Sequence, residues 1–288
     1  MMKFLSVLGN KFKLYWSLTK SLQTGLLLST GLAGFMSARC PVMHWFDFLG
    51  LTISLFISIA GSTVINMWYD RDIDAIMART CARPLPSGQI TKSETLRLGL
   101  ILSILGVSLS TILKPLYGLV VFAGLFFDVV VYTFWLKRRS AWSIVWGGVS
   151  GATPILAGRV FGLGRIDSVG IILSFAIMFW IPTHILTFAM RNYEDYQTAG
   201  IPTFASVYGF KVTRVIIALS SLVAALAIST AGLLIGIQWG FIHVLAVMSS
   251  GLLVLAIYSI LRPSDRINFG LFKYASLFML SAMILLSV

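Results

Sequence analysis

The sequence predicts an all-α, polytopic membrane protein with nine transmembrane helices. The first observation is compositional: 58% of the 288 residues are hydrophobic and 11% are charged, and the mean hydropathy is +0.91. Soluble domains average about 25% charged residues, so this chain carries too few to cover a water-facing surface. The second observation is that uncharged stretches of roughly 20 residues, the length that crosses a bilayer as a helix, recur along the whole chain.

Nine candidate spans are bounded by charged residues, prolines and glycines. They cover about 21–38, 47–69, 95–113, 116–136, 141–158, 168–190, 212–235, 240–261 and 269–288. The apolar block that contains the third and fourth spans is too long for one crossing, so we divide it at Lys114-Pro115.

The chain is expected to form one membrane-embedded domain over residues 1–288. We divide it into two four-helix halves, about 21–136 and 141–261, followed by a ninth helix at 269–288. Ahead of the first span, residues 1–20 are predicted to form an interfacial amphipathic segment, because large apolar residues recur there at steps of four. These residues are Phe4, Leu8, Phe12 and Trp16.

The distribution of basic residues predicts the orientation. With nine spans, eighteen of the 22 lysines and arginines lie on the side of the N-terminus. The other side holds Arg39, Lys114, Arg159 and Arg165. Cytoplasmic loops carry the excess of Lys and Arg, so we expect a cytoplasmic N-terminus. No transit peptide is visible, which favours a multi-pass protein of a prokaryotic plasma membrane. The net charge of +12 is then explained by topology and by contact with anionic membrane lipid. No nucleic-acid-binding module is visible, so nucleic acid is not an expected partner.

Scarce carboxylates gather where the second span ends. Asn66, Asp70 and Asp74 follow one another at steps of four in the segment INMWYDRDID, so a helix would place them on one face. Asp72 points elsewhere. A row of carboxylates with an amide oxygen suits Mg²⁺, which prefers oxygen ligands and shares them with substrate phosphates. A solvated helix end paired with Arg71 is the alternative, but it does not require acids at matched steps.

A second acidic segment, RNYEDYQTAGIP, follows the sixth span and carries Glu194 and Asp195. The predicted topology puts it on the same side of the membrane as the first. Basic residues accompany both segments, among them Arg83 and the Lys137-Arg138 pair. The prolines of the Pro84–Gly88 segment predict an extended loop. Acids and bases together on one face are what a metal–diphosphate substrate requires, because the metal bridges carboxylates to phosphate and the cations take the remaining charge.

At this point the residues resemble a known family. NMWYDRDID resembles the NxxxDxxxD signature of the UbiA superfamily of intramembrane prenyltransferases. DRDIDAIMARTCARPLPSG, VYTFWLKRRSAWSIVWGGVSGATPILAG and IPTHILTFAMRNYEDYQTAGIP are most similar to the branch of protoheme IX farnesyltransferases, the haem O synthases. In the superfamily's second motif, DxxxD, the two aspartate positions are occupied here by Asn192 and Tyr196. The acidic residue is Asp195 instead, as in that branch.

The resemblance implies the fold and the site. The fold is a nine-helix, isoprenoid-synthase-like bundle around a central cavity whose active site faces the cytoplasm. The implied Mg²⁺ ligands are Asn66, Asp70, Asp74 and Asp195, which with Tyr132 are also the expected catalytic residues. The implied diphosphate-binding residues are Arg83, Lys137 and Arg138.

The resemblance also implies the reaction. It is Mg²⁺-dependent transfer of a prenyl group from a prenyl diphosphate to a lipophilic acceptor in the membrane, first of all farnesyl to protoheme IX, giving haem O. A quinone precursor or an archaeal glycerol lipid remains open as the acceptor, and a transporter is a remote alternative. His184, an intramembrane histidine, is the expected acceptor-binding residue. It would ligate the haem iron, with a partner such as Thr187 or a backbone carbonyl, contact another acceptor, or serve the structure alone.

Overall fold

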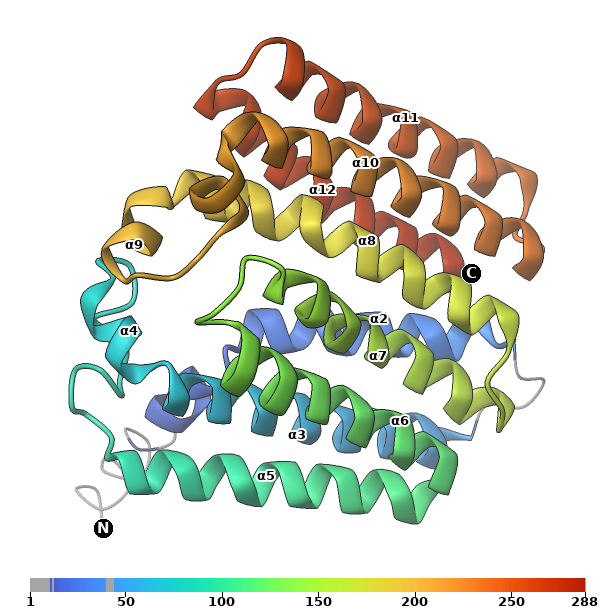
Figure 1. Ribbon diagram of the computed structural model, residues 1–288. Coiled ribbons are helices and arrows are strands. Elements are labelled where there is room, and N and C mark those ends of the chain that lie inside the picture. Colours follow the sequence, from blue (N-terminus) through green and yellow to red (C-terminus); the bar gives the residue numbers. More distant parts are fainter. Residues whose placement is uncertain (1–10, 12, 40–43, 288) are drawn as a thin grey trace.

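The computed structural model describes residue 11, residues 13–39 and residues 44–287. All regular structure in these ranges is helical (Figure 1). The helices are α2 (Ser21–Ser37), α3 (Trp45–Tyr69), α4 (Arg71–Ile76), α5 (Lys92–Leu113), α6 (Pro115–Phe126), the π-helix η1 (Phe127–Leu136), α7 (Ser143–Leu163), α8 (Ser168–Arg191), α9 (Tyr193–Thr198), α10 (Phe204–Ile235), α11 (Trp239–Leu261) and α12 (Asp265–Ser287).

Eight helical segments in the described residues are long and apolar enough to cross a membrane, with α6 and η1 counted as one. The all-α, multi-pass prediction is therefore confirmed. The first predicted span is α2, which has 17 residues and is not among the eight, although it packs against α3, α7 and α12. The ninth crossing, the two-half division and the orientation of the N-terminus stay predictions. Of the amphipathic segment, Phe4, Leu8 and Phe12 lie outside the described residues.

Local chemistry explains where the long helices begin and end. The division at Lys114 is confirmed, because that residue is extended and Pro115 opens α6 at a position where no backbone N–H is needed. Thr91 caps α5, accepting from the Glu94 N–H at 3.2 Å. The seventh span begins earlier than predicted, at Phe204, because α10 continues through a break at Gly209, whose φ of 81° suits glycine.

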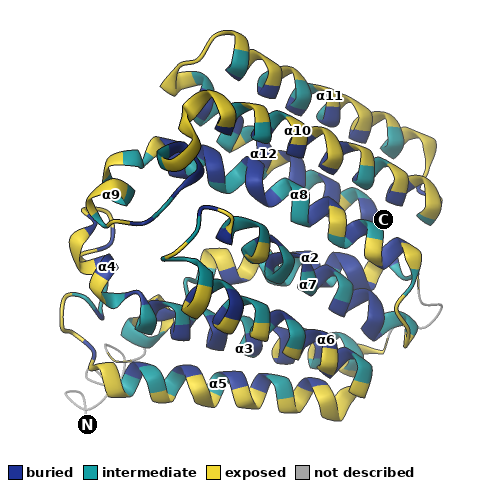
Figure 2. Cartoon of the chain, viewed as in Figure 1, coloured by how far each residue is buried: buried dark blue, intermediate teal, exposed yellow. Residues whose placement is uncertain are grey.

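Small residues let the helices pack closely. A Cβ atom placed on Gly158 of α7 would lie 1.8 Å from the carbonyl oxygen of Gly31 in α2, and one on Gly34 would lie 2.0 Å from that of Ile155. Helices in lipid associate through such contacts, since lipid leaves little hydrophobic drive between them. Many large apolar residues of α5 and α11 are instead exposed, and Figure 2 shows exposed residues along the outer sides of these two helices.

The two short helices lie at one end of the bundle, next to each other (Figure 1). Ile73 of α4 and Met77 pack with Ile201, and Tyr196 of α9 joins this small cluster. The segment between α4 and α5 is a series of turns rather than the extended loop we predicted. Gln89 donates its N–H to Pro84 O at 2.9 Å, so the prolines fix turn geometry here. Both acidic segments are thereby brought to the same end of the molecule.

Candidate active site

The predicted row of Asn66, Asp70 and Asp74 is present, although the helix bends within it. The helix α3 ends at Tyr69, and Asp70 has a φ of −84° and a ψ of 4°. The N–H of Asp70 nevertheless donates to Asn66 O at 3.0 Å, and the N–H of Asp74 donates to Asp70 O at 2.8 Å. Four-residue hydrogen bonding therefore continues across the junction with α4 and keeps the three side chains in register.

Each carboxylate of this row is held by a predicted diphosphate-binding residue. Arg83 donates two hydrogen bonds to Asp74, at 2.9 and 2.8 Å, and Lys137 donates to Asp70. Both aspartates are buried. Arg138 forms a two-bond pair with Asp72, each bond 2.7 Å long, and that pair lowers the pKa of the Asp72 carboxyl.

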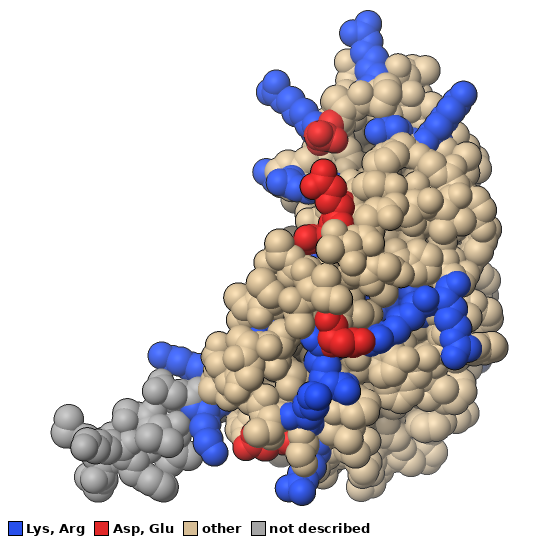
Figure 3. Space-filling model, turned by 60° about the vertical axis from the view of Figure 1, so that its left-hand side comes forward, with Lys and Arg blue, Asp and Glu red and all other residues tan. Residues whose placement is uncertain are grey.

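The second acidic segment joins the first through Asp195. Its Oδ1 accepts from the N–H of Ala78 at 3.2 Å, and its Oδ2 lies 3.7 Å from Arg79 Nε. Arg79 also donates to the Tyr196 hydroxyl at 3.3 Å. The sequence prediction that both segments share one face is confirmed by these contacts. Figure 3 shows acidic side chains along the middle of this face, with lysines and arginines around them.

The donor atoms of this face fit a hard cation, but they do not form a ready-made centre. Among the described residues, no three His, Cys, Asp or Glu side chains lie close enough together to hold a metal ion. Asp70 Oδ1 is buried without a hydrogen-bond partner in that part of the chain, with Arg138 Nη2 at 3.9 Å. Asn66 Nδ2 donates to Thr133 Oγ1 at 2.9 Å, which leaves its amide oxygen for another partner. An orphaned carboxylate oxygen, with an amide oxygen four residues earlier on the same helix face, suits Mg²⁺.

Tyr132 belongs to the π-helix η1, and Lys137 directly follows this helix. Its wide turns are visible at its C-terminal end, where the N–H of Lys137 donates to Tyr132 O, five residues earlier, at 2.8 Å. The Lys137 ammonium lies 5.6 Å from the centre of the Tyr132 ring. Burial opposes the charge of Lys137, but Tyr132 and the Asp70 carboxylate outweigh it and raise the pKa of the ammonium. Lys137 therefore carries a full positive charge at neutral pH.

Sequence reasoning missed Lys20, which belongs to this electrostatic environment. Lys20 directly precedes α2 and is half-buried. Burial, together with the nearby charges of Arg83 and Lys137, lowers the pKa of its ammonium to about 8, against the partial compensation of Asp74 and Asp70. We had assigned Lys20 to the interfacial segment. Its place directly before the first apolar run is the only signal of it in the sequence.

Sequence reasoning also missed Asp128, an acid inside the apolar stretch from 115 to 136. Ser62 of α3 donates a hydrogen bond to it, and Ser150 of α7 donates a second at 3.3 Å. A lone acid within a membrane span is a functional candidate by default, and that rule would have found it.

His184 lies on the inner part of α8, apart from the carboxylates. Its ring is stacked between Trp180 and Phe272, with ring centres 5.1 and 4.5 Å away. Its Nδ1 is 3.1 Å from the Ser276 hydroxyl of α12. The prediction that Thr187 is the hydrogen-bond partner of the His184 ring is wrong. The Thr187 hydroxyl donates to the backbone carbonyls of Thr183 and His184 instead.

Comparisons with known proteins show which family the chain resembles. The model of the UbiA prenyltransferase family matches residues 27–281. A protoheme IX farnesyltransferase of Archaeoglobus fulgidus is 38% identical over 271 residues, which are 93% of this chain and 94% of the relative. The one of Pyrobaculum arsenaticum is 40% identical over 224 residues, 77% of this chain and 80% of the relative.

Two solved structures share the fold. One comes from work on digeranylgeranylglyceryl phosphate synthase in membranes. It has a TM-score of 0.81 at 19% identity, and the match covers 96% of this chain and 98% of the chain in that structure. The other is a UbiA homolog of Archaeoglobus fulgidus bound to GPP and Mg²⁺. It has a TM-score of 0.67 at 15% identity, and the match covers 96% of this chain and 100% of the homolog's chain.

Proposed function

The chain belongs to the UbiA prenyltransferase family and is a prenyl-transferring membrane enzyme; from this premise we propose that it transfers farnesyl from farnesyl diphosphate to protoheme IX. One observation carries the proposal. Two acidic segments, on α3–α4 and on α9, meet at one end of a membrane bundle and are interleaved with cations that can bind diphosphate.

The choice of acceptor is supported by the relatives. The proteins named protoheme IX farnesyltransferase match most of this chain at 38–40% identity. The likeness to the glycerol-lipid synthase structure has 19% identity and concerns the fold. We therefore place protoheme ahead of a quinone precursor or a glycerol lipid.

The four predicted ligands supply the donor set for the metal. Asn66, Asp70, Asp74 and Asp195 would hold Mg²⁺, which when bound supplies positive charge to the diphosphate and so favours its departure. The orphaned Asp70 Oδ1 supports this role. The homolog bound to GPP and Mg²⁺ shows that the same fold accommodates such a pair.

The cations of the site have the geometry to bind the leaving group. In the substrate-free protein, Arg83 and Lys137 neutralise Asp74 and Asp70. An arriving diphosphate gives these cations a second anionic partner, and their charges stabilise it most when the C1–O bond breaks and a full negative charge develops. Arg138, which is partly exposed beside them, binds the outer phosphate oxygens.

The chain's remaining residues protect the prenyl cation that the diphosphate leaves behind. The Tyr132 ring, whose centre is 5.6 Å from the Lys137 ammonium, can stabilise an allylic cation with its π face. Apolar walls around the prenyl chain exclude water at this stage. The acceptor vinyl group then attacks C1 with its electron pair. The positive charge moves to the inner vinyl carbon, where a water molecule adds and loses a proton.

The acceptor is bound on the α8 side. His184 Nδ1 is engaged by Ser276, so Nε2 is the nitrogen available to iron, and Trp180 and Phe272 fix the plane of the ring. The excess of Lys and Arg on the same side as the two acidic segments supports a cytoplasmic active site in the cell membrane.

Purified protein incubated with Mg²⁺, a panel of prenyl diphosphates, and haem, a quinone precursor or a glycerol phosphate lipid tests the proposal. Mass spectrometry of the products should show a farnesyl-plus-water adduct of haem, with the other two acceptors unchanged. A prenylated quinone precursor or glycerol lipid with unreacted haem overturns the acceptor and leaves the prenyltransferase intact.

A further inference from the structure

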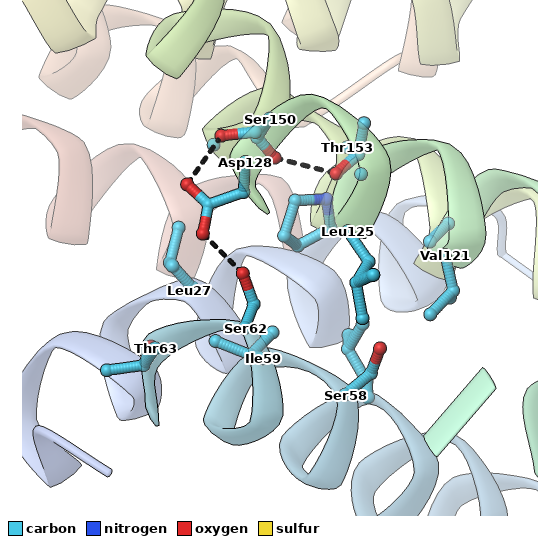
Figure 4. Close-up of a pocket in the computed structure, with 15 residues that line it drawn as sticks. Leu27, Ser58, Ile59, Ser62, Thr63, Val121, Leu125, Asp128, Ser150 and Thr153 are labelled. Carbon is cyan, nitrogen blue, oxygen red and sulfur yellow. Dashed lines mark hydrogen bonds between the residues drawn. The ribbon is translucent and has the colours of Figure 1, made fainter. Parts of the chain in front are cut away.

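A small pocket, lined mostly by apolar residues but also by an acid and several hydroxyl groups, lies inside the membrane part of the bundle between α2, α3, α6, η1 and α7 (Figure 4). Its volume is about 80 Å³. Asp128 projects into it, with Ser62 below one carboxylate oxygen and Ser150 beside the other. The hydroxyl-bearing side chains of Ser58, Thr63 and Thr153 also line the pocket.

Asp128 makes no direct ion pair within the described part of the chain, although the charges of Lys20 and Lys137 act on it from farther away. Among the described residues no Lys, Arg or His lies within ion-pair distance of Asp128, whereas every aspartate of the diphosphate face has one. It lies eight residues before the end of the span at Leu136. A carboxylate near the centre of a membrane helix costs about 2.5–3.5 kcal/mol on insertion scales. An asparagine or a serine at this position could form hydrogen bonds between the same three helices without that cost. The carboxylate therefore indicates a chemical role rather than a structural one.

The pocket continues the diphosphate face into the membrane. Side-chain pairs join α3 and η1 at successive turns: Lys137 with Asp70, Thr133 with Asn66, and Asp128 with Ser62. Ser62 lies eight residues before Asp70, or about 12 Å along a helix. A prenyl diphosphate whose phosphates occupy the first pair directs its C1 carbon toward the second and third. The bond-forming carbons therefore lie between the diphosphate and Asp128.

The pocket has the room and the partners that a water molecule needs. A water occupies about 30 Å³ of liquid and requires two to four polar partners, and both conditions are met here. An ionised carboxylate has about four acceptor positions. The two serines use two of them, which leaves Asp128 able to accept a proton-donating water while the serines hold its side chain in place.

We propose that Asp128 binds and activates the water that completes the proposed reaction. After the C1–vinyl bond has formed, the inner vinyl carbon is cationic. The water oxygen donates an electron pair to that carbon, one O–H bond breaks, and its proton passes to Asp128, which releases it to bulk water before the next turnover. The product carries a hydroxyl group, and the diphosphate has left with the electrons of the C1–O bond. This inference rests on the proposed farnesylation of protoheme.

Asp128→Asn tests this role, because it keeps the shape of the side chain and removes the base. Its amide oxygen can accept from one serine, and its NH₂ group can donate to the hydroxyl oxygen of the other. Without the base, the adduct cation loses a proton from its neighbouring CH₂ group instead and gives an alkene that is lighter by one water. We expect the ratio of hydroxylated to dehydrated product, measured by mass spectrometry, to fall about 10²-fold, the lower end of general-base effects. Affinity for farnesyl thiodiphosphate, which does not ionise readily, should change less than about twofold. Asp47→Asn, the same substitution at the opposite end of α3, should leave the product ratio unchanged.

The outcomes separate the two proposals. If the wild type does not prenylate haem, the proposed function fails and this inference falls with it. If the wild type makes the hydroxylated product and Asp128→Asn makes the same ratio, only the role of Asp128 is overturned. Should Asp128→Asn not fold, the double variant Ser62→Ala/Ser150→Ala decides, since it keeps the base but releases its side chain. If the ratio of hydroxylated to dehydrated product falls in the double variant, by less than the fall expected for Asp128→Asn, the proposal is supported. An unchanged ratio overturns it.

Discussion

Arg83 donates two hydrogen bonds, 2.9 and 2.8 Å long, to the buried carboxylate of Asp74. The two residues lie nine positions apart, and the turns between α4 and α5 bring them together. Arg83, a proposed diphosphate-binding residue, is thus paired with Asp74, a proposed metal ligand. If both proposals hold, one ion pair contributes to the stability of the fold and to the binding of the substrate.

Removing one partner of this pair should separate the two effects. Arg83→Ala leaves Asp74 buried and unpaired, so we expect a loss of about 3 kcal/mol in the free energy of unfolding. Diphosphate affinity should fall at least about tenfold. Arg83→Lys should restore most of the stability, because a single nitrogen, Nη1, makes both bonds to Asp74. It should restore less of the affinity, because an ammonium lacks the further N–H groups that a guanidinium offers to a diphosphate. Arg97→Ala, an exposed arginine of α5, is the control. Equal thermal stability of Arg83→Ala and Arg97→Ala would contradict the pairing.

Metal dependence should require both acidic segments. We expect Asp70→Asn and Asp195→Asn each to reduce turnover more than about 10²-fold, because each removes a carboxylate that favours the metal–diphosphate complex. A chelator should abolish wild-type turnover, and added Mg²⁺ should restore it. Asp265→Asn, at the exposed start of α12, should behave as the wild type. Undiminished turnover of the Asp195 variant would remove α9 from the metal site.

The transmembrane plan could be predicted from the sequence because it depends on long runs of similar residues. The span of α8 agrees with the prediction to one residue, and Pro115 marks the start of α6. The apolar runs exclude charge, and flanking charges mark their ends. Breaks within helices have weaker signals. Gly209 lies inside α10 with a φ of 81°, yet a single glycine in an apolar run is as often a packing residue.

Most of the candidate site that we predicted from the sequence consists of residues that form a pattern. Asn66, Asp70 and Asp74 have a helical period, and the resemblance supplied Arg83 and Lys137. Lys20 and Asp128 each stand alone in the sequence and belong to no repeated spacing. Ser62 and Ser150 can be recognised as hydrogen-bond partners of Asp128 only in the folded structure. The π-helix was not predicted either. Its i to i+5 bonding depends on tertiary contacts and leaves no period that we could read.

The lowered pKa of Lys20 predicts how substrate affinity depends on pH. Its pKa is about 8 instead of 10.5, so the ammonium of the substrate-free protein loses its proton as the pH rises through about 8. A diphosphate favours the charged form, and binding must then take up a proton. The dissociation constant of farnesyl thiodiphosphate should therefore rise several-fold between about pH 7.5 and about pH 9.5. Calorimetric titration measures it. Arg83 and Lys137, the other cations facing Lys20, remain charged over this range.

Lys20→Arg provides the matched control for this pH dependence. An arginine side chain keeps its charge at all these pH values, so the dissociation constant should depend much less on pH. A wild-type profile as flat as that of the arginine variant would show that Lys20 does not face the diphosphate.

The close contact between α2 and α7 should make Gly158 intolerant of any side chain. A Cβ atom there would lie 1.8 Å from Gly31 O, which is backbone and cannot move aside. Gly158→Ala should destabilise the protein by about 1–3 kcal/mol, as overpacked cores do. Gly25→Ala is the control, because nothing lies within 4 Å of a Cβ at that position of α2. Thermal unfolding in detergent should rank Gly158→Ala below the wild type and Gly25→Ala level with it or above it.

The acceptor role of His184 can be tested apart from the diphosphate site. Its ring is fixed by Trp180 and Phe272 and bonded through Nδ1 to Ser276, which leaves Nε2 for iron. Titration of the wild type with haem should shift the Soret band, and His184→Ala should weaken haem binding at least about tenfold with the affinity for farnesyl thiodiphosphate almost unchanged. His243→Ala, an exposed histidine of α11, should bind haem as the wild type does. A Soret shift that survives in His184→Ala would assign the iron to another ligand, because the alanine variant has no imidazole at this position.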